Sequence, residues 1–324
     1  MKQQRGAAIL TAMLTVVLVA TLASATLWQQ WRGVEVEAAE RSRTQSAWVL
    51  TGALDWARLI LREDARKGGA DHLGEPWAVP LAQARLSTFL AVDRSDAQAA
   101  DDTQEAFLSG QITDLQSRLN VFNLVKEGKI HEPSRLAFAR LFELLDLPAA
   151  ELTAMADQLR LAQDTGAGKG AESATAPSPA APLWPQDVDQ LAWVGLSPRS
   201  IAALRPYITI LPERTPVNLN TAAAEVIYAC VEAFDLADAH RLVTARSATH
   251  LAALSDAGKM SGNAAAKFDP EQHSIVTRFF EVRGNLQVEQ TTVQELSVVQ
   301  RLDNREVKTL WRQHGVVPAA PPLQ

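Results

Sequence analysis

An uncharged run near the start of the chain constrains the fold more than any other feature. Residues 6–31 contain no Asp, Glu, Lys or Arg and no Pro. A helix of this length is about as long as a bilayer core requires. Thr and Ser side chains in the run can bond back to the helix backbone, so they cost little in lipid. The sequence therefore predicts a membrane-spanning helix over about residues 7–28, with Lys2 and Arg5 on the cytoplasmic side.

Three interpretations of this segment compete. The first is a plain N-terminal membrane anchor, and the second is a secretory signal cut at Ala23-Ser24-Ala25. The third is a prepilin-type leader, in which a short basic peptide ends in Gly and the apolar run stays attached as the start of a long helix. Gly6 lies directly between the basic residues and the apolar run, as the third interpretation requires. We therefore expect cleavage between Gly6 and Ala7.

The chain beyond the apolar run also has a helical composition. From Val34 to Lys67 there is no Pro, and Ala, Leu, Glu and Arg dominate. The pair Gly68-Gly69 is a natural helix stop. A helix over residues 7–67 would be about 90 Å long at 1.5 Å per residue.

Composition limits the classes of function. With 324 residues, 47% of them hydrophobic, the chain can build a packed core outside the membrane segment. The net charge of -6 argues against a nucleic-acid partner. The single cysteine, Cys230, excludes an intrachain disulfide and is expected to be a core residue. No H-E-x-x-H, G-x-S-x-G or paired-cysteine pattern occurs, so we expect no enzymatic activity.

Strand patterns lie on both sides of a helical block. Residues 107–125 predict a β-hairpin, with two alternating apolar runs around a polar turn. Residues 126–275 are mainly helical in pattern, apart from a low-complexity segment at 164–182 that is expected to be a flexible linker. Residues 277–302 predict an antiparallel hairpin that turns near residue 290. The two strand regions can share one sheet only if the helical block is inserted between them.

One acidic stretch is a candidate metal site. It contains Asp93, Asp96, Asp101 and Asp102, in a region rich in Gly, Pro, Asp and Ala. Calcium takes clustered carboxylates of this kind as ligands. No EF-hand pattern is present, and a solvated loop is the alternative interpretation. The residues by themselves indicate no certain cofactor, and calcium is the one candidate.

Four segments together resemble a known family. The leader before the apolar run resembles the signal peptides of type II secretion pseudopilins. The segments RLNVFNL (118–124), TPVNLNTAAAEVIYA (215–229) and FFEVRGNLQV (279–288) resemble strand and motif segments of the large minor pseudopilins. The chain thus resembles, over nearly its whole length, the general secretion pathway protein K family.

The resemblance implies an α+β, pilin-like fold, with a long N-terminal helix packed on a small antiparallel sheet and a large helical insertion. Prepilin peptidase is expected to cleave after Gly6, with methylation of Ala7. The implied role is non-enzymatic: with the I and J minor pseudopilins, the chain would form the tip complex that initiates a pseudopilus for protein export across the outer membrane. The implied location is the bacterial inner membrane, single-pass, with the N-terminus cytoplasmic and the soluble domain periplasmic.

The implied organisation follows the chain from leader to tail. Its parts are a leader (1–6), the N-terminal helix (7–67), a first pilin-like part (68–125), a helical insertion (126–275), terminal pilin-like strands (276–312) and a disordered tail (313–324).

The resemblance also gives Thr11 a role in assembly. Most pilins carry Glu at the fifth position of the mature chain, where this chain has Thr11. In pilins that Glu is thought to pair with the amino terminus of a neighbouring subunit, since a carboxylate in an apolar bundle is costly without a partner. A tip subunit has no neighbour above it, so Thr11 implies a tip position. The family's K subunits also bind calcium, for which the four aspartates above are this chain's candidates.

Two other functions compete with this one. The first is a membrane-anchored periplasmic binding module that recognises secreted cargo or a ligand through the helical block. The second is a DNA-binding helix-hairpin-helix around Gly195, against which the acidic balance of that region argues.

Overall fold

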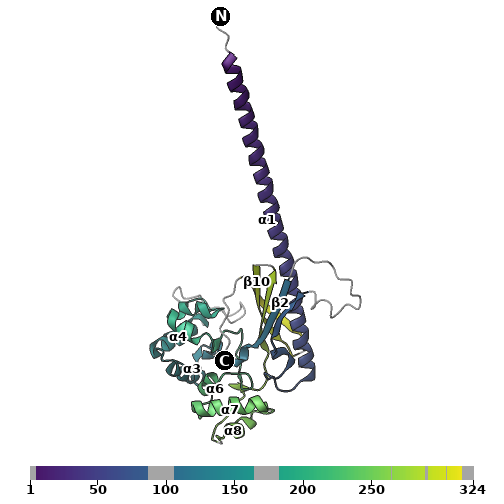
Figure 1. Ribbon diagram of the computed structural model, residues 1–324. Helices are drawn as coiled ribbons and strands as arrows, with labels where there is room; N and C mark the ends of the chain where they lie inside the picture. The colour runs from purple at the N-terminus through teal and green to yellow at the C-terminus, as the bar shows by residue number, and fades with distance from the viewer. Residues whose placement is uncertain are drawn as a thin grey trace, which may run out of the picture. The chain divides into compact units, whose positions relative to one another are not determined.

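The computed structural model describes residues 5–86, 106–163, 182–263, 265–288, 291–303 and 305–315. The chain divides into two units, Met1–Ala53 and Leu54–Gln324. The first unit is formed by most of helix α1, which runs from Arg5 to Lys67 (Figure 1).

Helix α1 has 63 residues and ends at the predicted stop. Gly68 and Gly69 follow it with φ values of +66° and +115°. These left-handed conformations are costly for residues with a Cβ atom, so glycine at both positions lets the chain leave the helix. The prediction of one continuous N-terminal helix is confirmed.

The second unit contains a five-stranded antiparallel sheet in the order β1-β2-β9-β10-β11. Its strands are β1 (Leu81–Arg85), β2 (Ala106–Asp114), β9 (Phe279–Val288), β10 (Thr291–Arg301) and β11 (Val307–Gly315). The pairing of β2 with β9 runs from Ala106↔Val288 to Asp114↔Phe280, so strands from both ends of the helical block meet in the middle of the sheet. The predicted shared sheet and the terminal hairpin of β9 and β10 are confirmed.

One face of this sheet packs on the last turns of α1. Leu54, Ala57 and Leu61 recur at helical spacing and are buried against Phe280 and Val282 of β9. Further members of this core are Trp77, Ile112, Val299 and Val307. The fold is therefore α+β and pilin-like, as expected.

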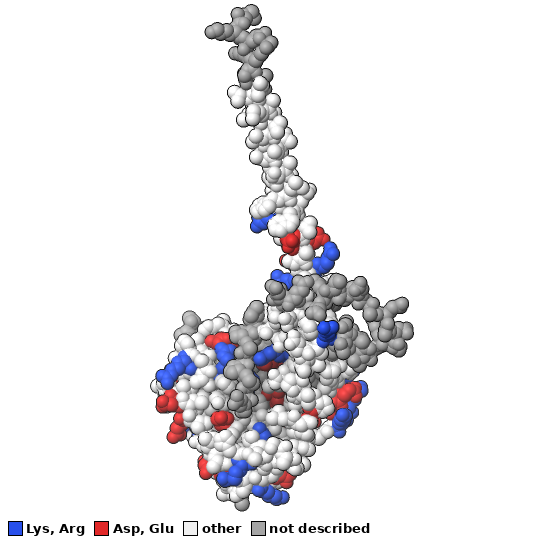
Figure 2. All heavy atoms as spheres, in the orientation of Figure 1, with Lys and Arg blue, Asp and Glu red and all other residues white. Residues whose placement is uncertain are grey.

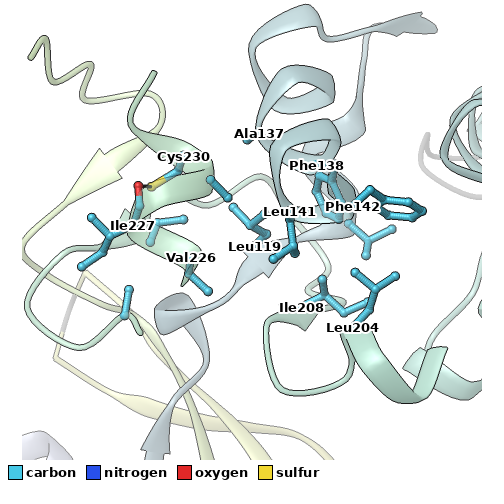
Figure 3. Packing of buried hydrophobic residues seen from close by; sticks show 14 of the residues in the cluster. Leu119, Ala137, Phe138, Leu141, Phe142, Leu204, Ile208, Val226, Ile227 and Cys230 are labelled. Atoms are coloured by element: carbon cyan, nitrogen blue, oxygen red, sulfur yellow. Dashed lines mark hydrogen bonds between the residues drawn. The ribbon is translucent and has the colours of Figure 1, made fainter. Parts of the chain in front are cut away.

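The helical insertion lies between β2 and β9 in the sequence. Its helices are α3 (Glu132–Leu144), α4 (Ala149–Ala162), α5 (Pro198–Leu204), α6 (Ala224–Cys230), α7 (Leu236–Ala248) and α8 (Asp256–Ser261), with 3-10 turns η3 (Val121–Leu124) and η5 (Val188–Val194). Phe138, Leu141 and Phe142 of α3 are buried at its centre (Figure 3). Ile227 of α6 and Leu204 of α5 are buried members of the same core.

Short strands link the insertion to the segments around it. They are β3 (Leu119–Asn120) with β6 (Ile208–Thr209), β4 (Val125–Lys126) with β5 (Lys129–Ile130), and β7 (Val217–Asn218) with β8 (His273–Ser274). A 3-10 turn, η1 (Pro76–Ala78), precedes β1.

The predicted hairpin over residues 107–125 is wrong. Strand β2 ends at Asp114, and the 3-10 turn η2 (Leu115–Ser117) follows. The Asp114 side chain caps that turn by accepting a hydrogen bond from the Gln116 amide at 2.7 Å. The next strand, β3, therefore leaves the sheet and pairs in parallel with β6.

The predicted disordered tail begins too early. Residues 313–315 belong to β11, because they continue its pairing with β10 up to Gly315. The remainder of that tail lies outside the described residues, as do residues 164–181 of the predicted linker.

We expect the core of the insertion to be sensitive to truncation at α3. Phe138→Ala should lower the free energy of unfolding by about 3–5 kcal/mol, because it removes a fully buried ring. Leu136→Ala, on the same helix but 47% exposed, should change it by less than about 1 kcal/mol. Urea unfolding followed by circular dichroism measures both, and equal losses would show that burial of the Phe138 ring does not stabilise this core.

Candidate functional site

The apolar part of α1 is the first candidate functional element. All described side chains from Ile9 to Arg41 are exposed. Among the described residues, α1 is the one helix long and apolar enough to cross a membrane. Figure 2 shows a stretch of this helix, drawn in white, that carries no charged side chains. Only a bilayer or other apolar helices can cover such a surface.

The predicted processing and assembly residues lie at the start of this helix. Gly6 and Ala7 are in its first turns, and Thr11 is exposed about one turn further on. Neither processing nor assembly at these positions is tested by the fold, so their roles remain predictions.

Three hydroxyl groups within the apolar run are satisfied inside the helix, as expected. Thr15, Thr21 and Thr26 each donate to the carbonyl oxygen three residues earlier, at 2.8–2.9 Å. These polar groups therefore add little to the cost of placing the helix in lipid.

The second candidate element is a buried carboxylate at the end of β2. Asp114 Oδ1 accepts hydrogen bonds from the Gln116 amide at 2.7 Å and from Thr277 Oγ1 at 2.6 Å. Its Oδ2 accepts from Asn218 Nδ2 at 3.0 Å and from Thr221 Oγ1 at 2.5 Å. Asp114 thus joins the sheet to the insertion and to the segment that enters β9. Burial raises the pKa of Asp114 to about 6, and the four donors oppose that rise.

Asparagine side chains extend this junction into the insertion. Asn120 Nδ2 donates to the Glu213 carbonyl at 2.7 Å and to Thr215 Oγ1 at 3.0 Å, while its Oδ1 accepts from the Leu211 amide at 3.1 Å. Asn123 exchanges two bonds with the backbone of Thr215, at 2.7 and 3.1 Å. These side chains take the place of backbone pairing between two loops.

The segments 118–124 and 215–229, which carry the family resemblance, therefore meet in space. Asn218 Oδ1 accepts from the Asn220 amide, and Asn220 bonds both the amide and the carbonyl of Leu251. The sequence patterns did not predict that Asp114 and these asparagines join the sheet to the insertion. The available signal was the placement of Asn inside otherwise apolar runs, where an unpaired amide would be costly.

A cluster of carboxylates lies where α1 ends. One oxygen each of Asp64, Asp71 and Glu75 lies within 4.8 Å of the others. Arg301 donates to Asp64 at 2.9 Å and to Asp71 at 2.6 Å, and Trp77 Nε1 donates to Glu75 at 2.7 Å. Burial raises the pKa of both Asp64 and Asp71. Arg301 therefore forms ion pairs with two of these three carboxylates.

The predicted calcium candidates cannot be joined to this cluster. Asp93, Asp96, Asp101 and Asp102 all lie outside the described residues.

The single cysteine is a core residue, as expected. Cys230 is buried at the end of α6, and burial raises the pKa of its thiol to about 12. A thiol that stays protonated at neutral pH is a poor nucleophile and a poor metal ligand.

The fold and the exposed apolar helix define a class: pilin-like α+β proteins with an N-terminal helix suited to anchoring in a membrane. Family models described as type II secretion system (T2SS), protein K, match residues 117–213 and 217–277. The type II secretion system protein K of Pseudomonas aeruginosa is 27% identical over 328 residues, which cover 96% of this chain and 93% of that protein. The chain is therefore similar to type II secretion system protein K over most of its length.

A solved structure shares the fold. It is the crystal structure of the GspK-GspI-GspJ complex from the enterotoxigenic Escherichia coli type 2 secretion system, with a TM-score of 0.60 and 18% identity. The alignment covers 86% of this chain and 99% of the matched chain. The likeness therefore extends over both the sheet and the helical insertion.

We expect Asp114→Asn to destabilise the second unit by about 2–4 kcal/mol. The amide group of Asn would turn hydrogens toward groups that themselves donate, including the Gln116 amide or Asn218 Nδ2. Asp157→Asn on the exposed side of α4 is the matched control, with an expected change below about 0.5 kcal/mol. Denaturant unfolding measures both, and equal effects would rule out the proposed role of the carboxylate.

Asp114 should also make stability depend on pH. Its pKa in the folded chain, about 6, lies above the ordinary value of 3.8. The stability it contributes is therefore fully present below pH 3.8 and is lost as the pH rises through about 6, on the order of 2–3 kcal/mol. The difference in unfolding free energy between wild type and Asp114→Asn, measured at about pH 4 and about pH 7, should change by that amount. A constant difference would contradict the prediction.

Proposed function

We propose that this chain is a minor pseudopilin that is cleaved between Gly6 and Ala7 and initiates assembly of the type II secretion pseudopilus for protein export across the outer membrane. The observation that carries this proposal is α1, in which an exposed apolar run continues without a break into a segment packed on the sheet. In that role the chain has no catalytic activity. Its apolar helix serves first as a membrane anchor and then as a packing surface in the filament.

The partners proposed are the I and J minor pseudopilins and the prepilin peptidase. The solved structure with the same fold is a complex of GspK with GspI and GspJ, which supports the first two. The proposed location is the inner membrane, with residues before the apolar run in the cytoplasm and the sheet and insertion in the periplasm. The domain limits given by the resemblance form part of this proposal.

Two features support a tip position: the lack of acidic residues in the apolar run and the size of the helical insertion. The first acidic residue of α1 is Glu35, so the apolar run, including Thr11, holds no carboxylate that needs a neighbour's amino terminus. The insertion between β2 and β9 adds a second hydrophobic core beside the sheet. Such a body would crowd neighbouring subunits if it were repeated along a filament.

A second candidate is a membrane-anchored periplasmic module that binds secreted cargo through the insertion. It is favoured by Leu183 and Trp193, which are 76% and 53% exposed on that part of the chain. Exposed aromatic side chains are frequent anchors in protein interfaces. A pull-down with the full chain that recovers only other pseudopilins would count against it.

The test is the mature N-terminus, determined by mass spectrometry of the membrane-extracted protein. We expect it to begin at N-methylated Ala7, and Gly6→Asp should abolish both processing and secretion. Gly33→Asp is the control, because a Cβ at Gly33 meets no atom within 4 Å and the residue lies past the apolar run. An N-terminus at Thr26 would indicate a secretory signal, and an intact Met1 a plain anchor; either result overturns the proposal.

A further inference from the structure

Two histidines that are distant in sequence stack face to face. The ring centroids of His72 and His250 lie 3.8 Å apart, and the ring planes differ by 7°. His72 is in the loop that follows α1, whereas His250 is in the loop between α7 and α8. The stack therefore forms a direct contact between the pilin-like part and the far end of the insertion.

Each loop is fixed by its own hydrogen bonds. The Asp71 amide donates to the Ile275 carbonyl at 2.9 Å, which fixes the backbone next to His72. The Leu251 amide donates to Asn220 Oδ1 at 2.8 Å, and Asn220 Nδ2 donates back to the Leu251 carbonyl at 3.0 Å. These bonds therefore hold the backbone beside each ring in place.

The geometry requires an uncharged His72. The Gly74 amide donates to His72 Nδ1 at 3.1 Å, so this nitrogen carries a lone pair and the ring proton is on Nε2. A proton added at Nδ1 would face the Gly74 N–H group. If His250 were protonated as well, two positive rings would lie in contact, and like charges at this distance repel.

The charged groups around the stack act in both directions. Asp64 and Asp71 favour a protonated His72, but both carboxylates are already paired with Arg301. Burial and the facing His250 ring act against the proton, and together they lower the pKa of His72. On the insertion side, Arg246 near the end of α7 donates to the Leu219 and Ala222 carbonyls.

We propose that His72 and His250 form a pH-sensitive contact that holds the insertion against the loop after α1 when both rings are neutral and releases it when both are protonated. Histidine changes charge between about pH 5 and pH 8, so the contact would respond to mild acidification. The release is local, because the Asp114 junction and the hydrophobic cores do not contain either ring. The contact would respond in this way whether or not the chain acts in secretion.

Hydrogen–deuterium exchange of the full chain in detergent micelles tests this contact. Acidification from about pH 7.5 to about pH 5, with intrinsic exchange rates corrected, should raise exchange about tenfold in residues 69–78 and 249–255. His250→Phe keeps a flat ring for stacking but has no proton to gain, so its exchange should rise clearly less on acidification than that of wild type, because only His72 can still be protonated. His240→Phe, at an exposed position on α7, is the matched control and should behave as wild type.

Two results would overturn the proposal. One is an unchanged exchange rate in wild type over this pH range. The other is a full pH response in His250→Phe, which would assign the response to the nearby carboxylates. If His250→Phe does not fold, His250→Gln, which is also neutral at every pH, must show the same reduced response.

Discussion

The second unit depends on one buried carboxylate. Asp114 ends β2 and gathers donors from three other segments of the chain, so the sheet, the insertion and the strand that returns to the sheet all meet at one side chain. A buried charge is tolerated only where each oxygen finds hydrogen-bond donors. This requirement ties the positions of Asn218, Thr221 and Thr277 to each other more strictly than apolar packing would.

Much of the fold could be predicted from the sequence, because its patterns are strong and local. The uncharged run before Arg32 and the Gly68-Gly69 stop defined α1, and period-two alternation defined β9 and β10. The hairpin over 107–125 was wrongly predicted because alternation gives a strand's faces but not its partner. The pairing partner of the strand after Asp114 depends on polar side chains that cap a turn and form hydrogen bonds to distant backbone groups. Such side chains leave almost no periodic pattern in the sequence.

Of the candidate functional elements, only the apolar helix could be predicted, because amino-acid composition alone identifies it. The apolar helix could be identified from residue types, since few structures apart from a membrane-spanning helix accommodate an uncharged run of that length. The asparagine contacts and the His72–His250 stack join residues far apart in the chain, so no local pattern indicates them. The four predicted aspartates were grouped by proximity in sequence, which says little about proximity in space, and they lie outside the described residues.

The pairing of β2 with β9 has a consequence for how the chain folds. The strand that completes the middle of the sheet is separated from its partner by the entire insertion, which gives the sheet a high contact order. During synthesis from the N-terminus, Leu54, Ala57 and Leu61 of α1 are made long before Phe280 and Val282, the residues against which they pack. These α1 side chains therefore lack these packing partners until nearly the whole chain has been made. The insertion can form its own core in that interval, so its folding shortens the loop that the sheet must close.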